Sequence, residues 1–269
     1  MPSTAVRDKD LAGATDVREL LVLWQNIHTR SIVPVGRLFL HDGRYRFGYV
    51  TGASSMGMRP LLGFPDFDQL YESYNIPLLF AQRIFDPARR DFRESIAELG
   101  ISSEATPWEQ LVRLGGRRQG DGVRVMEMPT VDHQGIATTR FLLHGTRHIP
   151  GPMRMCEGIH IQCTREERDK AVDQLREGDK LVLLHEEGNE HDPDALIVTS
   201  TGVPLGYVPQ VVSRAVRTLL LSQRSKRVRA VAVGGPQVPL GSRIVVEVKV
   251  EAPPNFSFDP RGEWKLAAG

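Results

Sequence analysis

The order of apolar and polar positions divides the chain into two successive stretches of strands and helices. In the first stretch, continuous or alternating apolar residues predict strands at residues 20–24, 33–40 and 45–50. The last two are joined by His41-Asp-Gly-Arg44, and an Asp-Gly pair between alternating segments is a strong signal for a tight β-hairpin. The chain is therefore expected to begin with a small antiparallel sheet.

Helical patterns follow this sheet. Helices are predicted at residues 64–71, 87–100 and 106–115, because prolines and capping residues stand near the start of apolar positions at helical spacing. The third begins with a Thr-Pro-x-Glu capping box and ends at a glycine. The Gly- and Arg-rich stretch 115–122 lacks the spacing of a phosphate-cradling loop and is predicted to be a plain loop before a strand at 123–128.

The second stretch contains a β-meander with an unusually polar first turn. Its sequence is Leu181-Val-Leu-Leu-His-Glu-Glu-Gly-Asn-Glu-His-Asp-Pro-Asp-Ala-Leu-Ile-Val198, followed by Gly202-Val-Pro-Leu-Gly-Tyr-Val-Pro209. Apolar strands alternate here with turn residues. Asn189 and Asp192 suit the turn because such side chains bond nearby backbone N–H groups. Amphipathic helices are expected before and after the meander, at 164–178 and 209–221, and two strands follow, at 227–233 and 242–251.

These elements predict an α+β fold in two domains, which a chain of 269 residues is long enough to form. The first domain is expected at residues 18–130 and combines a small antiparallel sheet with helices. The second is expected at residues 139–251 and combines strands with two helices. Residues 1–17 are polar and predict a flexible arm, while the proline-containing residues 252–269 predict an extended tail.

The composition, 41% hydrophobic and 25% charged, is that of an ordinary soluble protein. No apolar run approaches the ~20 residues of a membrane span, and the N-terminus lacks the apolar core of a secretory signal. Two cysteines are too few for a disulfide framework. We therefore expect a cytoplasmic protein that does not associate with membranes.

Charge is distributed unevenly along the second domain, although the net charge of the chain is only +1. Residues 139–212 contain 8 Lys and Arg against 12 Asp and Glu, whereas residues 213–251 contain 8 against 2. A local basic stripe either follows phosphate groups of nucleic acid or is a solvated face of a helix and a strand. The stripe consists of Arg214, Arg217, Arg224, Lys226, Arg227 and Arg229.

Three motifs in residues 139–251 together resemble the HIRAN domain, a module of Rad5-type and helicase-like transcription factor remodellers. They are Phe141-Leu-Leu-His-Gly-Thr-Arg-His-Ile-Pro-Gly151, then Gly188-Asn-x-His-Asp-Pro-x-Ala195, then Leu205-Gly-Tyr-Val-Pro209. The resemblance implies a small OB- or SH3-like β-barrel, here with two helices, that binds single-stranded DNA. Eukaryotic members of the family also capture a free 3′-hydroxyl end.

The same resemblance implies a set of DNA-binding residues. Arg147 would contact phosphate, and His148 and Tyr207 would stack on bases, all as parts of the first and third motifs. In the second motif the implied residues are Asn189, His191 and Asp192. Asp192 would accept a hydrogen bond from the terminal hydroxyl, since a carboxylate repels internal phosphates but tolerates a free 3′-OH.

Parts of this set remain open to other interpretations. Turn formation explains Asn189 and Asp192 at least as well as ligand contact does. Eukaryotic members tend to carry aromatic residues where His148 and His191 stand, and histidine is the weaker stacking platform. Arg214 and Arg217, from the basic stripe, are predicted to add phosphate contacts.

The first domain resembles, in its order of strand, hairpin, helices, Gly-rich turn and closing strand, the N-terminal subdomain of HipA-type kinases. Such a domain would dock a protein partner, for example a kinase, helicase or nuclease subunit. The ATP-binding core of a HipA-type kinase would lie downstream, where this chain carries the HIRAN-like segment instead. Kinase activity is therefore not implied.

Two catalytic or metal-binding alternatives carry weaker signals. Cys156-x3-His160-x2-Cys163 offers three zinc ligands, whereas a structural zinc site needs four. Asp194, together with Glu247 and Lys249, loosely resembles the signature of metal-dependent nucleases. We predict no bound cofactor or metal and no enzymatic activity.

Our leading hypothesis is a non-catalytic protein that binds single-stranded DNA or 3′ ends, in DNA repair, replication stress or defence against phage. The first alternative is a protein–protein adaptor or regulatory subunit of a toxin–antitoxin or defence system. The second is a metal-dependent nuclease.

Overall fold

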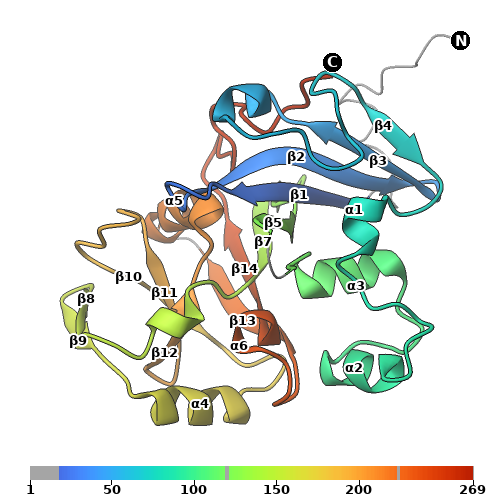
Figure 1. Cartoon of the computed structure of the whole chain (residues 1–269). Helices are drawn as coiled ribbons and strands as arrows, with labels where there is room; N and C mark the ends of the chain where they lie inside the picture. The colour runs from blue at the N-terminus through green and yellow to red at the C-terminus, as the bar shows by residue number, and fades with distance from the viewer. Residues whose placement is uncertain (1–17, 119–120, 223–224, 269) are drawn as a thin grey trace, which may run out of the picture. The chain divides into compact units, whose positions relative to one another are not determined.

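The computed structural model describes residues 18–118, 121–222 and 225–268 (Figure 1). The predicted arm at residues 1–17 and Arg224 of the basic stripe lie outside the described residues. The described chain forms two compact units. Unit 1 holds the residues up to Pro87, Ala105–Met128 and those from Asp259 onward, and unit 2 holds Ala88–Glu104 and Pro129–Phe258.

Unit 1 is built on a five-stranded antiparallel sheet in the order β4-β3-β2-β1-β5. Asp42 and Gly43, in the predicted hairpin, have φ of 49° and 70°. Two successive positive φ values are typical of a tight hairpin whose twist matches its strands, so the hairpin prediction is confirmed. The strands are β1 (Arg18–Gln25), β2 (Ile32–His41), β3 (Arg44–Tyr49), β4 (Tyr71–Ser73) and β5 (Val123–Glu127).

Helix α3 (Pro107–Leu114) begins and ends as its sequence predicts. The Thr106 hydroxyl accepts from the Glu109 N–H at 3.3 Å, and the Glu109 carboxylate accepts from the Thr106 N–H at 2.7 Å. Gly115 ends the helix with φ of 63°. The helix buries Trp108 in the core of unit 1, which also receives the short elements η2 (Ala53–Met56) and α1 (Leu78–Ala81).

The helix predicted at residues 64–71 is wrong. This segment forms turns that lead into β4, where Tyr71 pairs with Phe47 of β3. The Asp66 carboxylate accepts from the Asp68 N–H at 2.9 Å, and the Tyr71 hydroxyl donates to the Asp66 carbonyl at 3.1 Å. An aspartate that bonds its own neighbouring backbone favours a turn over a helix, and pairing with β3 selects the strand.

Each unit combines segments that are distant in the sequence. Helix α2 (Phe92–Glu98) belongs to unit 2, where the Glu98 carbonyl accepts from the Gly235 N–H at 2.7 Å. The end of the chain belongs to unit 1, where the Ala267 N–H donates to the Tyr49 carbonyl at 2.9 Å. Part of the stretch expected as an extended tail is therefore bonded to the end of β3.

Unit 2 contains three antiparallel sheets, with strand orders β13-β14-β7-β6, β10-β11-β12 and β8-β9. The predicted meander is confirmed as the three-stranded sheet. The strands are β6 (Thr130–Val131), β7 (Ile136–Leu142), β8 (Arg154–Cys156), β9 (Ile159–Ile161), β10 (Val182–His185), β11 (Leu196–Ser200), β12 (Val203–Tyr207), β13 (Lys226–Val233) and β14 (Ile244–Glu251).

The predicted β-barrel is not closed by continuous ladders among the described residues. The three- and four-stranded sheets are joined by bridges of single residue pairs, Lys180 with Arg229 and His144 with Tyr207, and by a few backbone bonds beside them, such as that from the Leu181 N–H to the Val228 carbonyl at 3.0 Å. At the second bridge the pairing stops after one residue, because Gly145 takes a φ of 59° and turns the chain away from the sheet. The α+β class is confirmed, and the barrel is open at these two seams.

The two predicted helices of unit 2 are confirmed as α4 (Arg165–Gln174) and α5 (Gln210–Leu221), and a short α6 (Leu240–Arg243) follows. Thr164 and Glu167 form a capping box at the start of α4. Helix α5 begins after Pro209 and buries its apolar face, as its spacing predicts. Within the described residues, no helix combines the length and apolarity needed to cross a bilayer.

Candidate nucleic-acid interface

Arg147 and His148 lie in the short 3-10 turn η3 (Thr146–His148), not in a strand as the resemblance implied. The turn starts at Gly145, whose φ is positive. A Cβ added at Gly145 would meet the Tyr207 ring at 2.8 Å, so a side chain fits neither the backbone nor the space there. The sharp turn leaves Arg147 and His148 exposed at the surface.

Arg147 and His148 interact with each other. The Nε of Arg147 donates to Nε2 of His148 at 2.9 Å. The pKa of His148 lies below its usual value, because partial burial and the positive charges of Arg147, His191 and Arg154 disfavour protonation. A neutral imidazole therefore accepts the guanidinium N–H and presents a flat ring beside a cation.

Arg154 of β8 supports the η3 turn from its buried side, although no sequence motif identified this residue. Its side chain is 9% exposed. Nη1 donates to the carbonyls of Ile149 and Pro152, each at 3.1 Å, and Nη2 donates to the carbonyl of His148. A fork of fixed donors that bonds three carbonyls fixes the backbone behind the exposed pair.

The same guanidinium connects the turn to the loop after β10. Nε of Arg154 donates to the Tyr207 hydroxyl at 2.9 Å, and this hydroxyl donates to Glu186 Oε2 at 2.8 Å. Asn189 Nδ2 donates to the same Glu186 oxygen at 2.8 Å. Burial and the hydrogen bond to Glu186 raise the pKa of Tyr207 well above its usual value. Half-buried Tyr207 thus lies against Gly145 with its hydroxyl inside a polar network.

Asn189 and Asp192 shape the loop by bonding its backbone. Asn189 Oδ1 accepts from the N–H groups of His191 and Asp192, at 3.0 and 2.9 Å. Asp192 Oδ1 accepts from the N–H of Asp194 at 2.9 Å. The turn-forming interpretation is therefore confirmed for both residues, and His191 is left exposed at the top of the loop.

Helix α5 holds the other side of the loop. The Ser213 hydroxyl donates to Asp192 Oδ2 at 2.7 Å, and Gln210 Nε2 donates to the His191 carbonyl at 3.1 Å. Nη1 of Arg217 donates to Asp194 Oδ1 at 2.7 Å. Of the two predicted α5 arginines, Arg217 is half-buried and ion-paired, whereas Arg214 is exposed.

The predicted residues of the three motifs therefore belong to one connected surface. The hydrogen-bonded path runs from the η3 turn through Arg154, Tyr207 and Glu186 to the loop and on to α5. His148 and His191 lie close enough for their charges to interact. We call the exposed part of this surface the turn–loop face; it consists of Arg147, His148 and His191.

The cysteine motif is not arranged for zinc. Cys156 and Cys163 are buried in an apolar cluster with Ile149 and Ile197, and His160 is exposed. Burial raises the pKa of the Cys156 thiol to about 11 and also raises that of Cys163, so both thiols hold their protons. Over the described part of the chain, no three His, Cys, Asp or Glu side chains gather as a metal-binding group.

The carboxylates of the nuclease alternative are held in separate ion pairs. Asp194 pairs with Arg217 at 2.7 Å, and Glu247 pairs with Arg140 and Arg229 at 2.7 and 2.9 Å. Each carboxylate is thus occupied by arginine.

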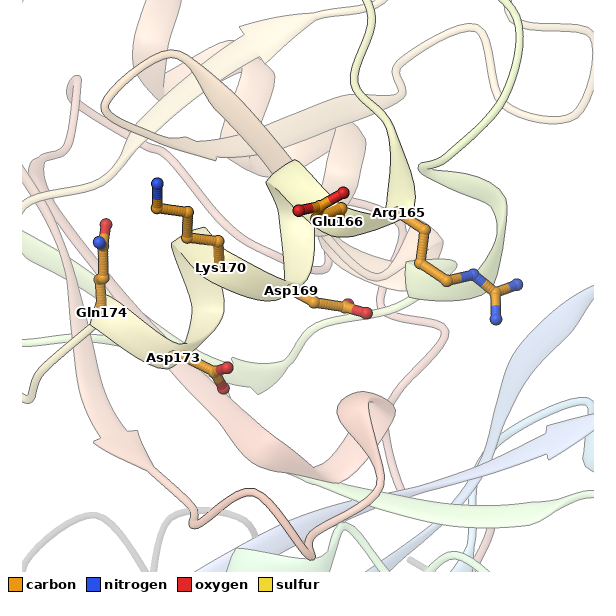
Figure 2. Close-up of a pocket in the computed structure, with 6 residues that line it drawn as sticks. All are labelled: Arg165, Glu166, Asp169, Lys170, Asp173 and Gln174. Atoms are coloured by element: carbon orange, nitrogen blue, oxygen red, sulfur yellow. The ribbon is translucent and has the colours of Figure 1, made fainter.

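A shallow depression of 780 Å³ runs along α4. Figure 2 shows that all six of its lining side chains come from this one helix and spread in different directions, and none is a predicted site residue. The structural contribution of α4 is instead its buried Arg168, whose Nη1 donates to the Thr146 carbonyl of η3 at 3.0 Å. The lining residues are Arg165, Glu166, Asp169, Lys170, Asp173 and Gln174.

Comparison with known proteins agrees with the motifs of unit 2. The family model described as the HIRAN domain matches residues 136–249. Among solved structures, the crystal structure of the HIRAN domain of human HLTF is similar at 10% sequence identity and a TM-score of 0.30, over 50% of this chain and 98% of that chain. No curated protein matches the chain. The resemblance of residues 18–130 to HipA-type kinases gains no support from these comparisons.

Proposed function

We propose that this protein binds nucleic acid through residues 136–249, which match the HIRAN family model, with single-stranded DNA or a 3′ end as the ligand. One observation carries the proposal. A buried arginine, Arg154, joins the η3 turn to the Glu186 loop, so that Arg147, His148 and His191 are exposed together.

The chemistry of the turn–loop face suits a single strand. The guanidinium of Arg147 would bond a phosphate, and the rings of His148 and His191 would lie under bases. Arg214, exposed on α5, would contact a further phosphate, and Arg217 would contribute less because Asp194 already holds it. Tyr207 would not contact the strand directly but would support the η3 turn by packing against Gly145.

A preference for 3′ ends would come from Asp192. Both of its carboxylate oxygens already accept one hydrogen bond, from the Asp194 N–H and the Ser213 hydroxyl. Each oxygen keeps a second lone pair, which a terminal hydroxyl could use. A 3′-phosphate at the same place would meet the negative charge of Asp192 and be repelled.

Fluorescence anisotropy tests the proposal with oligonucleotides that end in a 3′-OH or a 3′-phosphate. We expect tighter binding of the 3′-OH form, with a dissociation constant that rises with salt as phosphate contacts require. Arg165→Gln, an exposed arginine on α4, serves as the control with the same loss of charge. Equal, negligible and salt-insensitive binding of both oligonucleotides would defeat the proposal.

In a cell, such binding would bring the protein to damaged or stalled DNA or to invading phage DNA, in the cytoplasm of a bacterium and without a catalytic step. Magnesium-stimulated cleavage of the oligonucleotides, abolished in Asp194→Ala, would instead support the nuclease alternative.

A second candidate function, protein docking by unit 1, is favoured by its exposed apolar side chains. Leu62, Tyr74 and Leu78 are 66%, 71% and 64% exposed. Exposed large apolar side chains mark a protein-interaction site where they form one contiguous patch, so this candidate requires that the three side chains act together. A kinase, helicase or nuclease subunit that co-purifies after nuclease treatment, but is lost with Tyr74→Ser and Leu78→Ser, would support this role.

A further inference from the structure

The four-stranded sheet of unit 2 has one apolar face and one strongly basic face. Along β14, Val246, Val248 and Val250 are buried on the core side. The alternate positions Glu247 and Lys249 therefore point to the opposite side. This second face presents a regular array of side chains on paired strands, whereas the turn–loop face presents side chains from an irregular turn and a loop.

The register of the strands gathers cations on this face. Glu247 lies opposite Arg229 of β13 and opposite Arg140 of β7. Lys249 lies opposite Arg227, and Lys180 bridges to Arg229. Directly opposed residues point to the same side of an antiparallel sheet. We call this set the outer sheet face; it consists of Arg140, Lys180, Arg227, Arg229 and Lys249.

The outer sheet face is organised around one buried carboxylate. The side chain of Glu247 is 0% exposed. Arg140 donates to its Oε2 from Nε at 2.8 Å and lies 2.7 Å away through Nη2, while Arg229 donates to Oε1 from Nε at 3.0 Å and lies 2.9 Å away through Nη2. Burial alone would raise the pKa of Glu247, but the hydrogen bonds from the two guanidiniums outweigh this effect. The pKa therefore lies below its usual value, and the carboxylate is ionised at neutral pH.

This arrangement fixes the arginines without covering them. Arg140 and Arg229 remain 42% and 36% exposed. The Arg229 guanidinium carries five N–H donors, of which those on Nε and Nη2 face Glu247. A side chain that is already held in position loses less conformational entropy when it binds an anion. The solvent-exposed part of the Arg229 guanidinium is thus held in place for an oxyanion.

The cations on the outer sheet face outnumber the acids. Glu247 lies among them, and Glu251 follows at the end of β14, on the same side as Lys249. Like charges held this close repel one another, and a bound polyanion relieves the repulsion. Alternate residues on a strand are ~6.8 Å apart, close to the axial rise of two phosphates along one strand of a duplex, ~6.8 Å.

We propose that the outer sheet face binds the phosphodiester backbone of nucleic acid, without reading its sequence, as a contact separate from the turn–loop face. This inference rests on the proposed function only in taking nucleic acid as the ligand. The turn–loop face engages a strand or its end, and the outer sheet face engages backbone farther along the same molecule.

The test compares two double variants that lose equal charge within unit 2. Arg227→Gln with Lys249→Gln removes two cations of the outer sheet face but spares both arginines that hold Glu247. Arg165→Gln with Lys170→Gln removes two exposed cations of α4 as the control. Binding is measured by anisotropy against salt for oligonucleotides of ~4 and ~20 nucleotides and for a duplex of ~20 base pairs.

We expect the outer-face variant to bind the longer strand or the duplex about tenfold more weakly, with a log–log salt slope smaller by about 1.4 to 1.8, while the control binds like the unmodified protein. Which long ligand loses more affinity tells whether the face takes a single strand or a duplex. The short oligonucleotide should bind both variants equally. Thermal unfolding checks that each variant folds, and Lys180→Gln with Lys249→Gln is the substitute if the first pair does not.

One outcome would overturn the inference: equal affinities of the outer-face and control variants for both long ligands. Its failure is separable from that of the proposed function. If 3′-OH and 3′-phosphate ends bind alike and Arg147→Gln has no effect, the end-binding proposal fails. The affinity of the outer sheet face for long nucleic acid can still depend on its charge and on ligand length in that case.

Discussion

Unit 2 has two basic regions that are built in opposite ways. On the turn–loop face, Arg147 stands on irregular backbone beside imidazoles, and a buried cation, Arg154, fixes it from behind. On the outer sheet face the cations stand on paired strands, and a buried anion, Glu247, fixes them. In both regions, a buried charged side chain orients the charged side chains that are exposed to solvent.

This difference predicts that one face determines which ligand ends are selected and the other determines how tightly long nucleic acid binds. An irregular turn places a few unlike groups, a guanidinium, two imidazoles and a carboxylate, at particular positions around a ligand. A sheet repeats one kind of charge at regular spacing, which suits a repeating backbone and carries no information about sequence. We therefore expect variants of the first face to change which ends bind, and variants of the second to change how strongly long nucleic acid binds.

The largest effect is expected from Arg154→Met. The change removes four hydrogen bonds, to the carbonyls of His148, Ile149 and Pro152 and to the Tyr207 hydroxyl, and it leaves half-buried Glu186 without its cation. Breaking such a pair from one side lowers the free energy of unfolding by ~3 kcal/mol. Urea unfolding measures this loss. Arg154→Lys keeps the charge but not the forked donors, so its free energy of unfolding should lie between those of the unmodified protein and Arg154→Met. A loss below ~0.5 kcal/mol in Arg154→Met would contradict the role of this residue.

Arg147→Gln should weaken short 3′-OH oligonucleotides about tenfold, equivalent to ~1.4 kcal/mol, because a charged hydrogen bond to phosphate is lost. The residue is exposed, and within the described part of the chain its side chain bonds the His148 ring, so the urea midpoint should not move. Arg165→Gln is the matched control. If both variants bind alike, the turn–loop face is not the place where the strand lies.

Local signals let the sequence predict much of this fold. The capping boxes at Thr106 and Thr164, the Asp42-Gly43 hairpin and the meander each depend on residues a few positions apart. Prediction failed where distant pairing decides. Residues 64–71 become a turn and a strand because Tyr71 pairs with Phe47, and no local pattern reports that partner.

The same reason explains what was missed in the site. The motifs identified the exposed residues and the loop, yet Arg154 bonds Tyr207 across 53 positions and Ser213 bonds Asp192 across 21. Their only sequence signals are weak: an arginine between two methionines, and a serine on the apolar side of a helix. Both become interpretable when burial is known, since a buried charge requires partners.

A smaller effect is expected on the pH dependence of oligonucleotide binding, which should come from the turn–loop face and not from the outer sheet face. The pKa of His148 is lowered in the folded protein by partial burial and by Arg147, so the ring gains its proton at a lower pH than an unperturbed histidine, whose pKa is about 6.5. A phosphate beside it would favour the protonated form, so oligonucleotide binding should tighten as pH falls through that range. The free protein should lose stability over the same range, because the unfolded chain binds the proton more readily. Anisotropy against pH checks the first expectation, and His148→Asn should reduce the pH dependence; an unchanged profile would place His148 away from the ligand.

The smallest effect is expected on α5. Arg214→Gln should weaken strand binding about threefold and lower the salt slope by about 0.7, because one phosphate contact is lost. Arg217→Gln should do less, since Asp194 already neutralises that side chain. Salt titrations of the two variants decide this order. The reverse order would mean that Arg217 leaves Asp194 to reach the ligand.

The most direct test is an NMR titration of the 15N-labelled protein with an oligonucleotide of ~4 nucleotides that ends in a 3′-OH, a length suited to the turn–loop face alone. The account predicts shifts of the backbone amides in residues 144–149 and 186–192, with β13 and β14 unchanged. Shifts confined to β13 and β14, or none in η3 and the loop at saturating ligand, would contradict it.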